Sequence, residues 1–363
     1  MAEPLKNSYN RAYITRLAKA LKQHHPKFDS KAFSKAVFDK QWQERELKAR
    51  MSHIRGCIYD CLDLPYEDAL TVLLPAAESF GGYEAMFFPE YVEVYGQGHW
   101  DASMQALEVL TQYSSSEFAV RPFIEMDTQR MMGQMMSWAQ HDNEHVRRLA
   151  SEGCRPRLPW AKALPAFKQD PALIVPVLTQ LRCDPSLYVR RSVANNLNDI
   201  AKDNPEVTLD WMQQYFGDNE LTDWIIKHGC RTLLKQAHPE ALSLFGYGDV
   251  SAIKVASFTV DTPSLREGED LAFSFDIKRR GGELGKLRIE YGIDYQKANG
   301  SLSRKVFKVA EGQYNASNLS FQRRQSFRPM TTRKHYPGTH RVALLVNGVE
   351  LALEEFELAA VGQ

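Results

Sequence analysis

The residues with the clearest chemical potential lie in the stretch His145–Trp160, where charged side chains recur along one expected helix. At 100° per residue, Arg148, Glu152 and Arg155 fall on one side of that helix, opposite an apolar stripe that begins at Val146. The pattern therefore predicts a carboxylate held between two guanidinium groups.

Pro156 and Pro159 end this helix, because proline lacks an amide donor and has a fixed φ. Trp160 follows on a stiff loop. A carboxylate can stabilise positive charge that develops on a substrate, and an indole ring attracts a cation to its face. The alternative is purely structural: a solvated ion-pair face, with a tryptophan packed at the end of a helix.

A second copy of the pattern lies about 40 residues further on, in Tyr188–Ala201. Val189-Arg190-Arg191 matches Val146-Arg147-Arg148, and at the same offset Asn195 and Asn198 replace Glu152 and Arg155. Looser copies occur at Val120–Ile124 and Ile226–Leu234. A helical unit that recurs at this spacing is typical of HEAT-like repeats, which stack their apolar stripes and align their polar faces along a concave surface.

The pattern of hydrophobic residues divides the chain into two parts. Apolar residues at helical spacing occur over 8–24, 31–56, 66–74 and 101–113, and helical segments continue to residue 248. Alternating segments then predict strands at 254–260, 271–277, 287–291, 305–309, 342–346 and 350–358. We expect an α-solenoid of HEAT-like repeats over 1–248, followed by a small all-β sandwich of immunoglobulin-like type over 249–363.

One segment of the second part, Gln322–Tyr336, is basic and contains interleaved aromatic residues. Arg323, Arg324 and Arg333 are candidates for a clamp on a nucleic-acid backbone. The alternative is a solvated loop at the edge of the sandwich.

Composition narrows the function. The 363 residues carry 45 basic and 45 acidic side chains, so no global basic field favours nucleic acid. The 5 cysteines form no CxxC pair, which favours reduced thiols in the cytoplasm. The sequence shows no ligand spacing typical of a metal site, no phosphate-binding glycine loop, no apolar leader and no long apolar run. We expect no metal, no nucleotide cofactor and no membrane partner.

Four stretches resemble one family: Ser116–Phe123, His145–Gly153, Arg155–Trp160 and Tyr188–Ala201 are similar to the AlkC branch of the HEAT-like alkylpurine DNA glycosylases, sisters of AlkD. The likeness covers about residues 8–248, and the β part looks like the immunoglobulin-like extension of some AlkC members. The Arg-Pro-Arg-Leu-Pro-Trp string is specific, whereas Val-Arg-Arg is common in helical repeats. The resemblance implies a monomer that excises cationic N3-methylated bases, 3-methyladenine and 3-methylcytosine, from alkylated DNA without a cofactor.

A cationic base is already a good leaving group, so the remaining task is to stabilise an oxocarbenium-like sugar and orient water, which a carboxylate can do. We expect Glu152 to fill this role first and Asp199 second, whereas Glu117 is implied by the family motif alone. Trp160 would face the base or the sugar. The resemblance further implies that the base need not be flipped fully into a pocket.

The remaining expected contacts are to DNA. Arg148, Arg155 and Arg191 would hold phosphates, and Asn195 and Asn198 would add hydrogen bonds. The competing hypothesis is a HEAT-like scaffold that binds DNA or protein without chemistry, because most HEAT repeats are scaffolds. A carboxylate among arginines favours the enzyme, since a ridge that only binds phosphate gains nothing from it.

Overall fold

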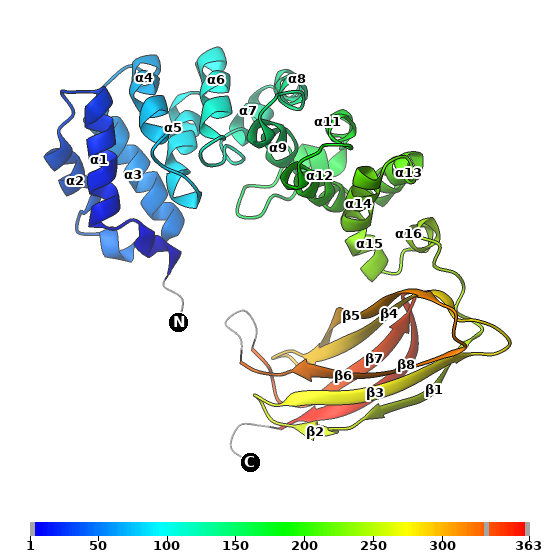
Figure 1. Cartoon of the computed structure of the whole chain (residues 1–363). Coiled ribbons are helices and arrows are strands. Elements are labelled where there is room, and N and C mark those ends of the chain that lie inside the picture. The colour runs from blue at the N-terminus through cyan, green and yellow to red at the C-terminus, as the bar shows by residue number, and fades with distance from the viewer. Residues whose placement is uncertain (1–3, 330–333, 360–363) are drawn as a thin grey trace. The chain divides into compact units, whose positions relative to one another are not determined.

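The computed structural model describes residues 4–329 and 334–359, and the chain divides into two compact units between Gly229 and Cys230 (Figure 1). The first unit is built from helices, and the second contains two short helices and a β-sandwich. The expected fold class, a helical repeat domain followed by an immunoglobulin-like sandwich, is confirmed.

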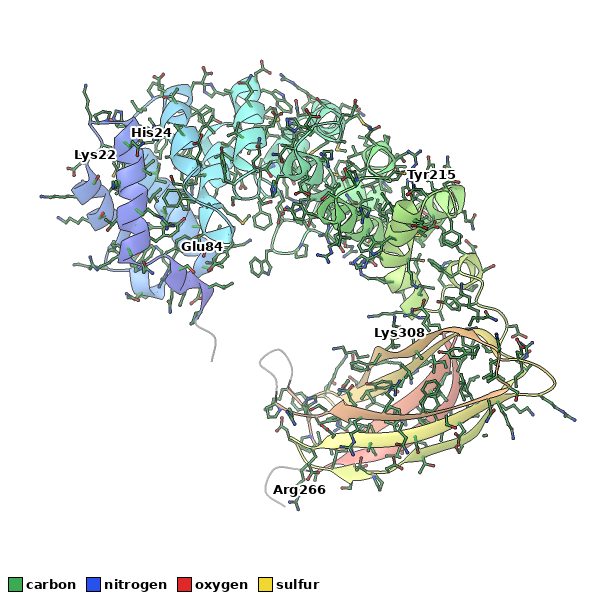
Figure 2. The ribbon with its side chains drawn as sticks, viewed as in Figure 1. Lys22, His24, Glu84, Tyr215, Arg266 and Lys308 are labelled. Atoms are coloured by element: carbon green, nitrogen blue, oxygen red, sulfur yellow. The ribbon has the colours of Figure 1, made fainter. Side chains whose placement is uncertain are left out.

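The helices of the first unit form two rows. The outer row contains α4, α6, α8, α11 and α13, and the inner row contains α3, α5, α9, α12 and α14 (Figure 1). Side chains fill the space between the rows (Figure 2). The bounds are α1 Arg11–His24, α2 Ser30–Val37, α3 Leu47–Leu62, α4 Tyr66–Ala77, α5 Phe87–Tyr95, α6 Trp100–Leu110, α7 Arg121–Met126, α8 Thr128–Trp138, α9 Glu144–Gly153, α10 Pro165–Gln169, α11 Val175–Gln180, α12 Leu187–Ile200, α13 Pro205–Tyr215 and α14 Glu220–Gly229.

Local sequence explains where these helices begin and which face they bury. The Asn143 side chain accepts the His145 amide at 2.8 Å and so caps α9, and proline stands in the first turn of α7, α10, α11 and α13. The two apolar stripes predicted from sequence are both buried: Val146, Leu149 and Ala150 on α9, and Val189, Val193, Leu197 and Ile200 on α12. α9 and α12 pack against each other in the inner row.

Two of the expected helical segments are interrupted by turns. The segment 31–56 contains α2, a short 3-10 turn at Trp42–Glu44 and the first part of α3, because the chain turns between Phe38 and Glu46. The looser repeat at Ile226–Leu234 ends α14 at Gly229 and starts α15 at Arg231. None of the described helices has the length and apolarity needed to cross a bilayer.

The second unit begins with α15 (Arg231–Lys235) and α16 (Pro239–Leu244) and continues as two sheets. One sheet has the order β1-β3-β6 and the other β2-β8-β7-β4-β5, with aromatic and aliphatic side chains between them. The strands are β1 Ile253–Val260, β2 Ser264–Leu265, β3 Asp270–Arg279, β4 Gly285–Gln296, β5 Leu302–Tyr314, β6 Asn318–Ser326, β7 Gly338–Val346 and β8 Val349–Leu358.

Strand β6 was missed in the sequence. It lies at the edge of its sheet, and its residues alternate between exposed and half-buried positions. The basic segment expected to be a clamp or a loop therefore begins as a regular strand paired with β3. Its apolar residues are only two, Leu319 and Phe321, so the periodicity was too weak to predict a strand.

Candidate active site

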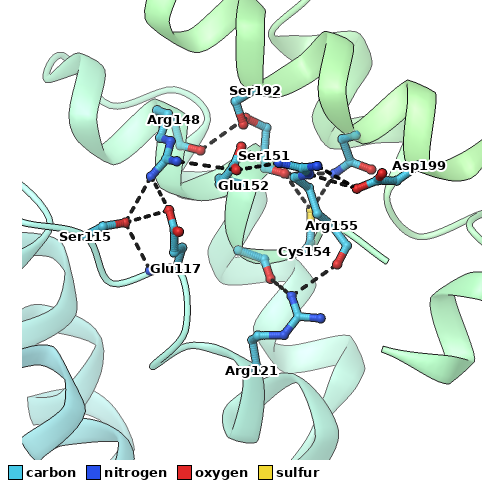
Figure 3. A network of polar contacts seen from close by, with 12 residues as sticks. Ser115, Glu117, Arg121, Arg148, Ser151, Glu152, Cys154, Arg155, Ser192 and Asp199 are labelled. Carbon is cyan, nitrogen blue, oxygen red and sulfur yellow. Dashed lines mark hydrogen bonds and ion pairs between the residues drawn. The ribbon is translucent and has the colours of Figure 1, made fainter. Parts of the chain in front are cut away.

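Five side chains of the first unit form a continuous row of alternating charge (Figure 3). Arg148 Nη1 lies 2.5 Å from Glu117 Oε2, and Arg148 Nη2 lies 3.4 Å from Glu152 Oε1. Arg155 Nη1 reaches the same Glu152 oxygen at 2.7 Å, and Arg155 Nη2 lies 2.9 Å from Asp199 Oδ2. We call these residues the charged row.

The charged row draws on three elements that the repeat packing brings together. Arg148 and Glu152 project from α9, and Arg155 follows directly after its end. Asp199 comes from α12, which packs on α9, while Glu117 lies in the segment before α7. Sequence phasing indicated the grouping on α9. It could not place Glu117, whose position depends on the fold of an irregular segment.

Small polar residues tie the row to its surroundings. Ser115 Oγ donates to Glu117 Oε2 at 2.8 Å and accepts from Arg148 Nη1 at 2.9 Å. At the other end, Lys202 donates to Asp199 Oδ1 at 2.9 Å. Lys202 is the third cation of the cluster, after Arg148 and Arg155. Three positive charges therefore balance the three carboxylates.

Both arginines of the row are fixed in their charged form. Burial disfavours the charge of Arg148, but Glu152 and Glu117 outweigh that effect and raise the pKa of its guanidinium. Burial likewise opposes the charge of Arg155, and Glu152 and Asp199 raise its pKa. Glu152 and Asp199 are themselves buried, with side chains 7% and 2% exposed. The row is therefore a rigid, largely desolvated array in which a further charge would be felt strongly.

Trp160 stands out on the loop that follows the row. Its side chain is 68% exposed, and its backbone has a φ of 67°, a left-handed conformation that bulky residues rarely adopt. The Lys48 ammonium donates to its carbonyl oxygen. The loop closes on itself because the Leu164 amide donates to the Pro156 carbonyl at 3.1 Å. Packing therefore does not explain why an indole occupies this strained position.

Arg121, which sequence reasoning did not select, holds this loop in place. Its buried guanidinium donates to the carbonyls of Lys162 at 2.8 Å, Gly153 at 3.0 Å and Arg155 at 3.1 Å. Burial lowers the pKa of Arg121 to about 10. The signal that could have found it is its register, because Val120-Arg121 corresponds to the first arginine of each Val-Arg-Arg copy.

The first arginines of the other two copies are also structural. Arg147 donates to the carbonyls of His141 and Asp142, and Arg190 donates to those of Asp184 and Pro185. Each one fastens the turn that precedes its own helix. The repeated motif therefore combines one arginine for the fold with a second that is available for other roles.

The structure places the remaining candidate residues as follows. Arg148 and Arg155, expected at phosphates, are engaged with the carboxylates of the charged row. On α12, Arg191 is exposed, Asn195 is half-buried and Asn198 is buried.

The basic candidates of the second unit lie on or beyond strand β6. Arg323 is half-buried and donates to the Val309 carbonyl at 3.2 Å, whereas Arg324 is exposed. Arg333 lies outside the described residues. Within the described part of the chain, no cluster of three or more His, Cys, Asp or Glu side chains is arranged to hold a metal ion.

The fold and this site define a HEAT-like repeat protein with an appended immunoglobulin-like domain. Residues 254–360 match the family described as the C-terminal Ig-like domain of the uncharacterised protein YhaZ. The chain is 46% identical to the uncharacterized protein YhaZ of Bacillus subtilis, over 95% of this chain and 96% of that protein.

A solved structure extends the comparison to a named activity. The Pseudomonas fluorescens alkylpurine DNA glycosylase AlkC, bound to DNA containing an abasic site analog, has a TM-score of 0.95 and 40% identity, covering 99% of this chain and 100% of that one. The chain belongs to the AlkC branch of the HEAT-like repeat DNA glycosylases.

Proposed function

We propose that this protein is a DNA repair glycosylase that removes cationic N3-methylated bases, 3-methyladenine and 3-methylcytosine, by hydrolysis of the N-glycosidic bond. The observation that supports it most is the charged row beside the exposed Trp160, within a chain that is 40% identical to AlkC over its whole length. A surface that only binds DNA phosphates would gain nothing from three carboxylates.

The cationic base is already a good leaving group. As the bond between C1′ and the base nitrogen breaks, its electron pair neutralises the positive charge of the base, which leaves without protonation. The sugar becomes oxocarbenium-like, and water then adds at C1′ and loses a proton. A fixed carboxylate near C1′ lowers the energy of this cationic sugar, because desolvated electrostatic interactions are stronger than those in water.

Within this mechanism, Glu152 is our first candidate for the carboxylate and Asp199 the second. Both arginines approach Oε1 of Glu152, which leaves Oε2 as the oxygen available to the sugar or to water. Glu117 shares Arg148 with Glu152 and is the third candidate. We assign Arg148 and Arg155 the task of holding these carboxylates in position, because their donors are already engaged with them.

Trp160 would receive the cationic base or the deoxyribose on its π face, an interaction worth about 0.5–2 kcal/mol. Exposed Arg191 and half-buried Asn195 on α12, together with Arg324 on β6, are the candidates for contacts with the DNA backbone. Buried Asn198 would act by supporting α12.

The test is the release of free bases from DNA treated with a methylating agent. The proposal predicts that the protein releases 3-methyladenine and 3-methylcytosine, with no added metal or nucleotide, and leaves unmodified bases in place. Retention of every methylated base, with intact binding to the same DNA, would favour a HEAT-like scaffold instead.

A further inference from the structure

A cavity of about 220 Å³ lies in the first unit between the start of α3 and the helix α5. Tyr83, Met86, residues of the segment 115–125 and Trp160–Lys162 complete its walls. We call it the α3–α5 pocket. It adjoins the candidate active site directly, because Ser115, which bonds both Glu117 and Arg148, and Trp160 line it as well.

Two carboxylates of α5, Glu90 and Glu93, lie one turn apart and line this pocket. Glu90 Oε1 accepts a hydrogen bond from Ser52 Oγ at 2.5 Å, whereas Glu90 Oε2 is buried and has no hydrogen-bond partner within the described structure. Burial raises the pKa of both groups, that of Glu93 to about 7, and Glu90 adds to the effect on Glu93. An unsatisfied buried acceptor is costly, so it favours a ligand that brings N–H donors.

The cations around the pocket are engaged with other groups. Arg121 donates to backbone carbonyls, and Lys162 pairs with Glu125. Arg55 donates to Tyr95 Oη at 3.1 Å, and Lys48 donates to the Trp160 carbonyl and lies 5.0 Å from the centre of the Phe118 ring. In the described part of the chain, neither forms an ion pair with Glu90 or Glu93. A helix-to-helix salt bridge, the ordinary structural role of such carboxylates, is therefore not what holds them here.

The other walls select the shape of the ligand. Trp160, Phe118 and Tyr83 bring aromatic rings to the pocket, and Met51 and Pro89 bring aliphatic groups. The volume lies below the roughly 300 Å³ at which pockets for drug-sized ligands begin, so it suits one planar heterocycle and not a whole nucleotide.

We propose that the α3–α5 pocket binds the free methylated base after its bond to deoxyribose has broken. The amino group of the base would donate to Glu90 Oε2, and its ring would lie between aromatic walls next to Trp160. This proposal rests on the proposed function, because it takes the leaving base as the ligand.

The test is calorimetric titration of the full chain, without DNA, with free 3-methyladenine. Wild type is compared with Glu90→Gln and Glu93→Gln, which keep the shape of the side chain but remove its charge. Glu90→Gln loses a charge-assisted hydrogen bond and should weaken binding by about 10- to 100-fold. Glu93→Gln loses only a neighbouring carboxylate and should weaken binding less. Glu67→Gln is the matched control, because Glu67 is an exposed carboxylate on α4 whose partner is His99. We expect it to bind the base as wild type does.

A second measurement uses the same variants during repair. Free 3-methyladenine added to methylated DNA should slow multiple turnovers by wild type and by Glu67→Gln, and should inhibit Glu90→Gln and Glu93→Gln less. Thermal unfolding confirms that the variants are folded; both substitutions remove a costly buried charge and should not lower the melting temperature.

Two results would overturn the pocket assignment: no binding of free 3-methyladenine by wild type at millimolar concentration, or equal affinity in Glu90→Gln, Glu93→Gln and Glu67→Gln. If wild type releases methylated bases but either result is obtained, the pocket alone is refuted. If wild type releases no methylated base, the proposed function itself fails.

Discussion

Among single residues, Trp160 has a position in the fold that stability does not explain. It is 68% exposed, so replacing it by alanine should cost less than about 1 kcal/mol of unfolding free energy. Excision should nevertheless slow by about 2- to 30-fold, the equivalent of losing a cation–π contact of 0.5–2 kcal/mol.

Thermal unfolding and base release, measured on the same preparation, separate these two effects. The contrasting variant is Trp138→Ala: Trp138 is 1% exposed and donates to Glu108 at 2.8 Å, so its loss should cost about 3–5 kcal/mol. A comparable loss of stability in Trp160→Ala would show that Trp160 packs as a core residue.

Glu93 gives the protein a specific dependence of stability on pH. Its pKa rises from 4.5 to about 7 on folding, chiefly because of burial. Between these values the folded chain keeps a proton that the unfolded chain has lost, so the free energy of unfolding should fall as pH rises from 4.5 to 7 and then level off.

Glu93→Gln removes this effect. The variant should be more stable than wild type at pH 8 by about 1–3 kcal/mol, and the difference should vanish near pH 4. Chemical unfolding at the two pH values measures it. A variant that is less stable than wild type at pH 8 would mean that Glu93 is ionised and paired in the folded protein.

At the scale of secondary-structure elements, the end of α9 is packed without spare room. A Cβ atom on Gly153 would lie 2.6 Å from Val120 Cγ2 and 3.0 Å from Met135 Cε. Gly153→Ala should therefore lower stability by about 1–2 kcal/mol, since overpacking exceeds the gain in helix propensity. It should also slow excision, because the Gly153 carbonyl accepts from Arg121, which holds the Trp160 loop.

Gly133→Ala provides the control on the neighbouring helix α8. Nothing lies within 4 Å of its added Cβ, so the substitution should raise stability by up to about 1 kcal/mol through helix propensity alone. Melting curves of both variants test the contrast. Equal stabilisation by the two would show that α9 has room to shift.

Some features of these helices and strands could be predicted from the sequence, and others could not. The stripes of α9 and α12 follow from a strong helical period, and so does the placement of Arg148 and Glu152 on one side. Arg155 was expected on the same helix but reaches Glu152 from just beyond the helix end. The contact between Arg155 and Asp199 depends on how two repeats pack, and Glu117 sits on an irregular segment. Periodicity carries no information about either. Strand β6 was not predicted, because polar and charged residues at this sheet edge leave too few apolar residues to show a period-two pattern.

Two successive arginines at the start of a helix have different roles. Residue type alone does not distinguish Arg147 from Arg148, but helical phasing selects Arg148. In the structure Arg147 fastens the preceding turn and Arg148 joins the charged row. The difference comes from the 100° between successive helical residues, which directs one side chain to the loop and the other to the site. A phosphate contact assigned from residue type alone overlooks these internal partners.

At the scale of the whole molecule, the proposed DNA contacts of the second unit can be tested by salt dependence. Arg324 is exposed on the edge strand β6, so Arg324→Ala should make the slope of log K against log salt less steep by about 0.9 on duplex DNA, as expected for one lost phosphate contact. Fluorescence anisotropy at several salt concentrations measures the slope. Arg280→Ala, in the turn after β3, should leave it unchanged, and equal slopes for both variants would remove Arg324 from the interface.

Glu152→Gln tests most directly whether a carboxylate of the charged row stabilises the cationic sugar. The measurement is single-turnover release of 3-methyladenine, with protein in excess over DNA. Glu144→Gln, on the exposed first turn of the same helix, serves as the control. Glu152→Gln should slow the chemical step by about 10²–10³, the scale seen on losing one preorganised electrostatic group, while affinity for undamaged DNA stays the same or rises. Equal rates for wild type, Glu144→Gln and Glu152→Gln would contradict the account and remove Glu152 from the chemistry.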